Sequence, residues 1–176
     1  MTPEGGVAVI PGSVMDLSAI GFVETHTPQH IILIRLLIAA LLGGMIGYER
    51  EAHSLAAGLR THILIATAAA LFTMLTFEIY AATEQANPDP IRAIEAVTAG
   101  IAFLDAGAIF QQRGSVQGLT TGAGMWLAGA LGVTVALGYY LIALVVAVLA
   151  VIVLAALRAF AHRVVGGRER SPNEPT

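Results

Sequence analysis

The sequence predicts an all-α membrane protein, a polytopic helical bundle with five transmembrane helices. Of its 176 residues, 56% are hydrophobic and only 12% are charged, and the mean hydropathy is +0.77. These values are typical of a chain that dissolves in lipid. No charged residue occurs between Arg113 and Arg158, a stretch long enough for two helices of about 20 residues each. A soluble enzyme with a small core is therefore excluded.

Five apolar segments follow one another along the chain. They are Ile31 to Tyr48, Thr61 to Tyr80, Ala93 to Phe110, Leu119 to Leu137 and Tyr139 to Leu157. Each has a length that crosses a bilayer as a helix, and a helix satisfies its own backbone groups in lipid, whereas an open strand does not. The last two segments are separated only by Gly138, which predicts a tight helical hairpin at that glycine.

The chain divides into three parts. Residues 1–30 contain three acidic residues and no arginine, so they lack the positive start of a secretory signal peptide. We expect an irregular lead-in there, or a short helix on the membrane surface. Residues 31–158 form the transmembrane domain. The glycines and prolines of residues 159–176 predict a short disordered cytoplasmic tail.

Arginine placement predicts the orientation of the chain in the membrane. An odd number of spans puts the two termini on opposite sides, and seven arginines fall in segments on the C-terminal side against Arg92 alone on the other. The seven are Arg50, Arg60, Arg113, Arg158, Arg163, Arg168 and Arg170. Because positive residues are retained in the cytoplasm, we expect the N-terminus outside and the C-terminus in the cytoplasm.

Several function classes lack support in the sequence. There is no cysteine, and the five histidines have no metal-ligand spacing. No hydrolase or phosphate-loop motif is present either, so neither catalysis nor a resident metal or cofactor is expected. A net charge of −3 argues against a nucleic-acid partner, which requires a dense basic surface. The lipid bilayer is the first partner that the composition predicts.

Three charged residues form the outer ion group: Arg35, Glu78 and Glu95. Arg35 and Glu95 each lie about 6 Å below the outer ends of their spans, at a rise of about 1.5 Å per residue, and Glu78 lies near the outer end of its span. We expect the three to meet at one level. They could form a buried ion pair that fixes helix order, an entry site for ions or protons, or side chains that extend to the interface.

Polar residues also gather at the predicted cytoplasmic ends of the spans. This inner polar cluster consists of Glu49, Arg50, Arg60, Thr61, Asp105, Thr120 and Thr121. Its charges could simply anchor the topology. Alternatively, the free amides at the start of the second span, near Arg60 and Thr61, could bind an anion such as a lipid phosphate.

Asp105 is the most deeply placed acid of this cluster, about 21 Å from the outer end of its span. No cation lies within that span near it. We expect it to find a partner such as Arg60, Arg50 or His62 at the ends of other spans. A structural pair, a proton or cation site, and a contact with a partner protein all stay open.

Glycines predict close helix packing. Gly43 and Gly47 form a small-xxx-small pair, and Gly100, Gly107 and Gly118 continue the pattern in later segments. Tight packing leaves little room for a wide pore in one chain. We expect these faces to support self-association into a homo-oligomer.

Four motifs in order give the chain a family resemblance. They are Gly43 to Glu51 (GGMIGYERE), Ala57 to His62 (AGLRTH), Gly100 to Ile109 (GIAFLDAGAI) and Gly118 to Thr121 (GLTT). Together they resemble the MgtC/SapB family of bacterial inner-membrane proteins, over roughly residues 31–158. The family usually has glycine where this chain has Asp105.

The resemblance implies a multi-pass protein of the bacterial inner membrane with a cytoplasmic C-terminus. It also implies a link to magnesium limitation, stress adaptation and survival in host cells, and it suggests the membrane ATP synthase as a candidate partner. Many relatives carry a cytoplasmic ACT-like domain, for which residues 159–176 are too short.

Two functions follow as hypotheses. The first is a regulatory protein that binds other integral membrane proteins through its inner polar cluster. The alternative is a small transporter or channel for protons or ions, Mg²⁺ among them, that uses Asp105 and the outer ion group as stations across the bilayer.

Overall fold

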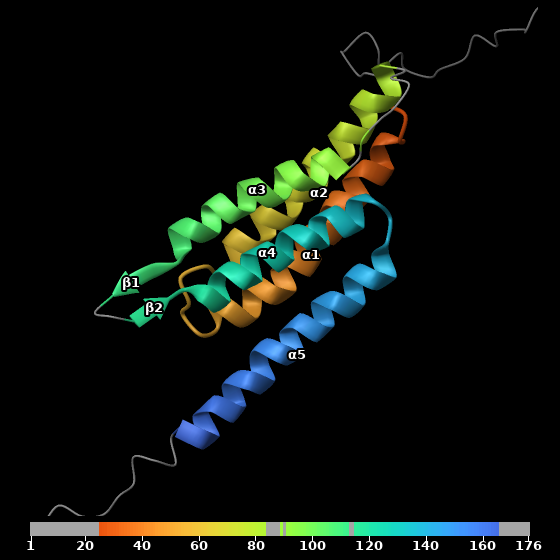
Figure 1. Ribbon diagram of the computed structural model, residues 1–176. Coiled ribbons are helices and arrows are strands. Elements are labelled where there is room, and N and C mark those ends of the chain that lie inside the picture. The colour runs from red at the N-terminus through yellow and green to blue at the C-terminus, as the bar shows by residue number, and fades with distance from the viewer. Residues whose placement is uncertain (1–24, 84–88, 90, 113–114, 166–176) are drawn as a thin grey trace, which may run out of the picture.

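The computed structural model describes residues 25–83, 89, 91–112 and 115–165. These contain five helices, α1 (Gln29–Glu51), α2 (Leu59–Thr83), α3 (Ile91–Ala108), α4 (Leu119–Ala136) and α5 (Tyr140–Val165), and a short hairpin of β1 (Phe110–Gln112) and β2 (Ser115–Gln117). Figure 1 shows the helices running alternately up and down one bundle, with the start of α1 and the end of α5 at opposite ends. The predicted all-α membrane bundle is confirmed.

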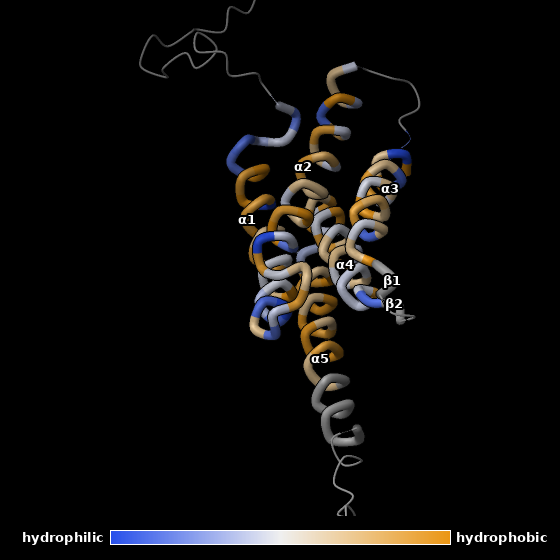
Figure 2. The backbone as a smooth tube through the Cα atoms, turned by 90° about the vertical axis from the view of Figure 1, so that its left-hand side faces the viewer, coloured by the Kyte–Doolittle hydropathy of each residue, from blue (hydrophilic) through white to orange (hydrophobic). Residues whose placement is uncertain are grey.

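Helix length and hydropathy fit a bilayer. Within the described residues, α1, α2 and α4 are each long and apolar enough to span a membrane, and α5 contributes an apolar stretch from Tyr140 to Ala156. Apolar residues occupy most of the helices in Figure 2, whereas polar residues concentrate at helix ends and connections. The helix α3 carries Arg92, Glu95 and Asp105, which lowers its mean hydropathy.

The hairpin corrects one predicted boundary. Phe110 was assigned to the third span by its hydropathy, but it lies in β1 and pairs with Gln117. The helix stops at Ala108 because the chain must turn back towards α4 within a few residues. Gly118, before the first residue of α4, has a φ of +88°, and a Cβ atom there would collide with the carbonyl oxygen of Ala108. Only glycine suits this position.

The remaining boundaries differ by a few residues. Gly138 has a φ of +86° and separates α4 from α5, as the hairpin prediction requires. The last helix continues to Val165, into the segment predicted to be a disordered tail. Residues 1–24, which hold most of the lead-in, and residues 166–176 lie outside the described part of the chain.

Close contacts of α2 with α1 and α4 hold the centre of the bundle together. A Cβ atom on Gly43 would lie 2.6 Å from the carbonyl oxygen of His62, and one on Gly47 would lie 2.7 Å from the Cα atom of Leu59. On α4, a Cβ atom on Gly132 would collide with the carbonyl oxygen of Ala66. Gly43 and Gly47 thus lie where α1 and α2 approach each other closely.

Two glycines of α3 do not have the predicted packing role. A Cβ atom on Gly100 or Gly107 would meet no atom of the described chain within 4 Å. The sequence pattern was sound, but it does not say which face of a helix its own bundle covers. At both positions no neighbouring helix of the described chain covers the α3 backbone.

The apolar core lies between α1, α2, α4 and α5. Ile46, Leu131 and Val135 are almost completely buried in it. The last helix contributes the small side chains of Ala143, Ala147 and Ala150 to the same core, at helical spacing. Large side chains on the outer faces, such as those of Leu41 and Leu141, are exposed, as expected for surfaces that contact acyl chains.

Gly132→Ala is expected to lower the free energy of unfolding by about 1 to 3 kcal/mol, the usual cost of overpacking, because its methyl group would meet backbone. The measurement is unfolding in mixed detergent micelles followed by circular dichroism. The control is Gly107→Ala, which adds the same methyl group in open space. Equal stability of the two variants would contradict the packing of α4 on α2.

Candidate functional site

The centre of the inner polar cluster is a buried contact between α1 and α4. The guanidinium of Arg50 donates a hydrogen bond of 2.7 Å to the hydroxyl of Thr121. Arg50 is 2% exposed and Thr121 is 4% exposed, and the neighbouring Glu49 is also buried. A charged hydrogen bond shielded from water is stronger than one at a surface, so this contact fixes α1 against α4.

His62 belongs to the same buried region, from α2. It is fully buried, and its Nδ1 donates to the carbonyl oxygen of Gly58 at 2.8 Å. Its Nε2 makes no hydrogen bond within the described chain and lies where a Cβ atom on Gly124 would be 3.1 Å away. The sequence analysis considered His62 only as a partner for Asp105. Its position, a polar residue one turn inside an apolar helix, could have indicated a buried polar site.

The N-terminus of α2 carries its own anion. The carboxylate of Glu51 accepts a hydrogen bond of 3.0 Å from the backbone amide of Leu59. A side-chain carboxylate at a helix N-terminus satisfies a free amide and interacts favourably with the helix dipole. The anion expected near Arg60 and Thr61 is thus supplied for this amide by Glu51, the last residue of α1.

The remaining members of the inner polar cluster differ in exposure and in their contacts. Arg60 and Thr120 are exposed, and Thr61 is half-buried. The side chain of Asp105 lies beside Gly122 of α4, the residue after Thr121. None of the described residues forms an ion pair with it, and its Oδ1 is buried without a hydrogen bond there. The expected pair with Arg60 is therefore wrong.

The outer ion group does not form, which corrects the second predicted site. Arg35 donates hydrogen bonds to the carbonyl oxygen of Ala136 at 2.8 Å and to the hydroxyl of Tyr140 at 3.0 Å. Glu78 accepts hydrogen bonds from the backbone amides of His26 and Thr27 at 2.6 and 2.9 Å. Glu95 is exposed. The position of a residue along its helix predicts a depth, but depth does not specify the direction in which the side chain points around the helix.

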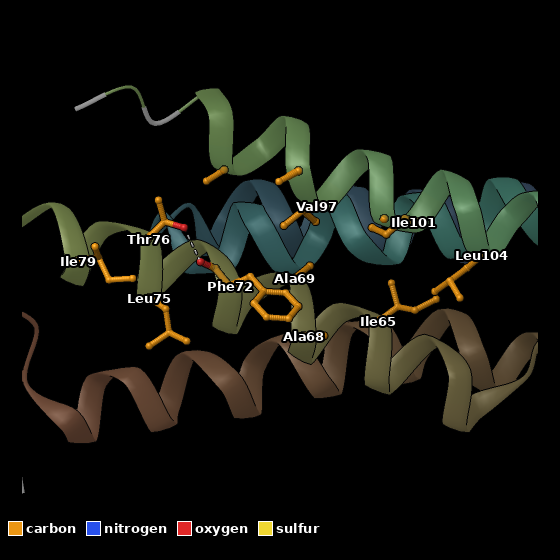
Figure 3. Close-up of a pocket in the computed structure, with 13 residues that line it drawn as sticks. Ile65, Ala68, Ala69, Phe72, Leu75, Thr76, Ile79, Val97, Ile101 and Leu104 are labelled. Carbon is orange, nitrogen blue, oxygen red and sulfur yellow. Dashed lines mark hydrogen bonds between the residues drawn. The ribbon is translucent and has the colours of Figure 1, made fainter. Parts of the chain in front are cut away.

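An apolar groove lies between α2 and α3. This α2–α3 groove has a volume of about 700 Å³. Its α2 wall runs from Ile65 to Ile79 and its α3 wall from Ala93 to Leu104 (Figure 3). Thr76 contributes the one polar side chain among the lining residues, and its hydroxyl donates to the carbonyl oxygen of Phe72. The groove therefore offers no free polar group to a solute.

The sequence profile of the MgtC family matches residues 36–163. The chain belongs to the MgtC family. The matched region contains the whole inner polar cluster and both walls of the α2–α3 groove, whereas Arg35 lies immediately before it. No solved structure matches the chain significantly.

Curated relatives support the assignment. The chain is 39% identical over 120 residues to "Protein MgtC" of Brucella abortus (strain 2308), which covers 68% of this chain and 48% of that protein. It is 36% identical over 133 residues to "Protein MgtC" of Salmonella typhimurium (strain 14028s / SGSC 2262), 75% of this chain and 54% of that one. The "Putative magnesium transporter YhiD" of Escherichia coli (strain K12) is 35% identical over 125 residues, 69% of this chain and 58% of that one.

The matches cover only part of each relative. The chain spans about half the length of the MgtC relatives that it matches. The names of the relatives point to a membrane protein without enzymatic activity. The relatives are longer proteins, so the match covers only part of each of them.

Thr121→Val is expected to destabilise the protein by about 1.5 to 3 kcal/mol, the value of a hydrogen bond to a charged group, because it removes the acceptor for the buried Arg50 guanidinium. Detergent unfolding measures the loss, and Thr121→Ser should restore most of the stability. Thr120→Val, which changes the exposed neighbouring threonine, is the control. If both valine variants were equally stable, the Arg50 contact would not stabilise the fold.

Proposed function

We propose that this MgtC-family protein is a regulatory membrane protein that binds another integral membrane protein at its cytoplasmic end. The contact surface consists of the exposed members of the inner polar cluster, Arg60 and Thr120. Following the family resemblance, the function is linked to adaptation to magnesium limitation, and the membrane part of the ATP synthase is the first partner to test.

The division of the inner polar cluster carries the proposal. Its buried half, the contact of Arg50 with Thr121, makes α1 and α4 one rigid support. Glu51 fixes the start of α2 to the end of α1. Arg60 and Thr120 then present polar groups on a surface whose backbone does not need to be ordered upon binding, which reduces the entropic cost of association.

The proposal includes an orientation in the bacterial inner membrane. The α1–α2 connection, the hairpin and the last described turn of α5 lie at the same end of the bundle (Figure 1). Arg50 and Arg60 lie at this end as well, so the positive-inside rule supports placing it in the cytoplasm. The N-terminal side then faces outwards.

Arg60→Ala is expected to reduce recovery of the partner about tenfold, which corresponds to about 1.4 kcal/mol of binding free energy. The experiment is affinity purification from gently solubilised membranes, with the ATP synthase membrane sector quantified in the eluate. Thr83→Ala, an exposed change at the opposite end of the same helix, should leave recovery unchanged. Undiminished recovery with Arg60→Ala would remove the proposed surface.

The alternative function is ion or proton transport, and Asp105 is the observation that favours it. Its Oδ1 is buried and makes no hydrogen bond in the described part of the chain, and an acid at such depth is often part of an ion pathway. Against this alternative, Arg35 and Glu78 are each bound to backbone or hydroxyl groups at separate places.

Flux measurements separate the two functions. If the protein conducts, purified chains in liposomes should show Mg²⁺ or proton flux, and Asp105→Asn should abolish it, because the amide has no charge to offer. Asp89→Asn, which changes an exposed acid just before the same helix, is the control. Absence of flux in the unmodified protein would reject transport.

A further inference from the structure

The outward face of α3 is the part of the bundle that its own chain covers least. Within α3, all of whose residues are described, only Ala93 and Ile101 are buried. Phe103 is 81% exposed, more than any other large hydrophobic residue of the described chain. This face lies beside the mouth of the α2–α3 groove, which Ala96 and Gly100 line.

Small residues leave the α3 backbone accessible on this face. Ala96 and Gly100 line the groove and form a small-xxx-small pair. A Cβ atom on Gly100 would meet nothing within 4 Å of the described chain, whereas the glycines of α1 and several of those of α4 contact neighbouring helices. In membranes an uncovered pair of small residues such as Ala96 and Gly100 allows a second helix to approach closely.

We propose that the helix that covers this face is α3 of a second copy of the same chain. Ala96, Ala99 and Phe103 follow one another at spacings of three and four residues, the repeat that forms one seam between two parallel helices, and Arg92 and Glu95 lie at the N-terminal end of this seam. Copies inserted in one membrane share the same orientation, so their α3 helices are parallel. Identical residues then lie at the same depth.

Charge complementarity selects a second copy over other occupants. Arg92 and Glu95 are both exposed at the same end of α3, and the described residues show no ion pair for either. A twofold axis along the membrane normal brings Arg92 of one copy towards Glu95 of the other, and the reverse contact forms at the same time. The chain thus carries both the positive and the negative partner of this contact. An acyl chain or an unrelated helix would not supply them.

The aromatic ring and the bare glycine give the interface its steric fit. Side chains on a helix point towards its N-terminus, so Phe103 covers the level of Gly100, three residues earlier. In the parallel pair, Phe103 of each copy lies at the depth of the open α3 backbone of the other. Phe72, Leu75 and Ile79 of the groove are exposed and extend the apolar surface that the second copy covers.

Cysteine cross-linking tests the geometry directly, because the chain has no cysteine of its own. Ala99→Cys lies on the proposed axis and should give a disulfide-linked dimer with itself on mild oxidation in lipid vesicles, since the bond requires Cα atoms within about 7 Å. Leu141→Cys, exposed on α5, is the control and should stay monomeric. Adducts of other mass with Ala99→Cys, or cross-linking no higher than that of the control, would overturn the proposal.

A charge exchange tests the pairing independently of folding. In the Ala99→Cys background, Arg92→Glu alone or Glu95→Arg alone should each lower the cross-linked fraction about fivefold, because each copy then carries like charges. Mixing the two variants, distinguished by tags, should restore cross-linking, with mixed dimers well above the half expected from random pairing. Random pairing, or no loss in either single variant, would exclude the Arg92–Glu95 contact and with it the second copy as the occupant.

Discussion

The fold depends on the close approach of α1, α2 and α4 at positions that have no side chain. Lipid provides no hydrophobic drive for helices to associate, so they must gain contact through tight packing and the few polar bonds between them. Gly43, Gly47 and Gly132 allow this approach to α2. The same closeness encloses Arg50 and His62, so that the polar groups of three helices lie inside protein and away from acyl chains.

The sequence predicted the helices well because each one has to satisfy its own backbone in the membrane. One local error, Phe110, arose because hydropathy does not distinguish the end of a span from a short apolar strand. The turn at Gly138 was predictable, since two apolar segments left no other residue for it. The profile match and the motifs that carry the family resemblance cover this same region.

The sites were less predictable, and the reason is geometric. Position along a span gives depth, which is why Arg35 and Glu95 were expected to meet, but it does not give direction around the helix or the choice of neighbour. Arg35 instead reaches the end of α4, where carbonyl groups lack helical partners. The spacing of the glycines likewise indicated that another helix could pack closely on Gly43 or on Gly100. It did not indicate that, within the described chain, a helix packs only on Gly43.

The hydrogen bonds of Arg35 have a consequence for biogenesis. This arginine lies in α1, the first helix of the described chain, yet its acceptors, Ala136 and Tyr140, belong to the junction of α4 and α5. Until that junction is synthesised, the guanidinium has neither of these acceptors, and a charge without a partner is costly in hydrocarbon. Insertion of α1 therefore gains this stabilisation only after α4 and α5 have been made.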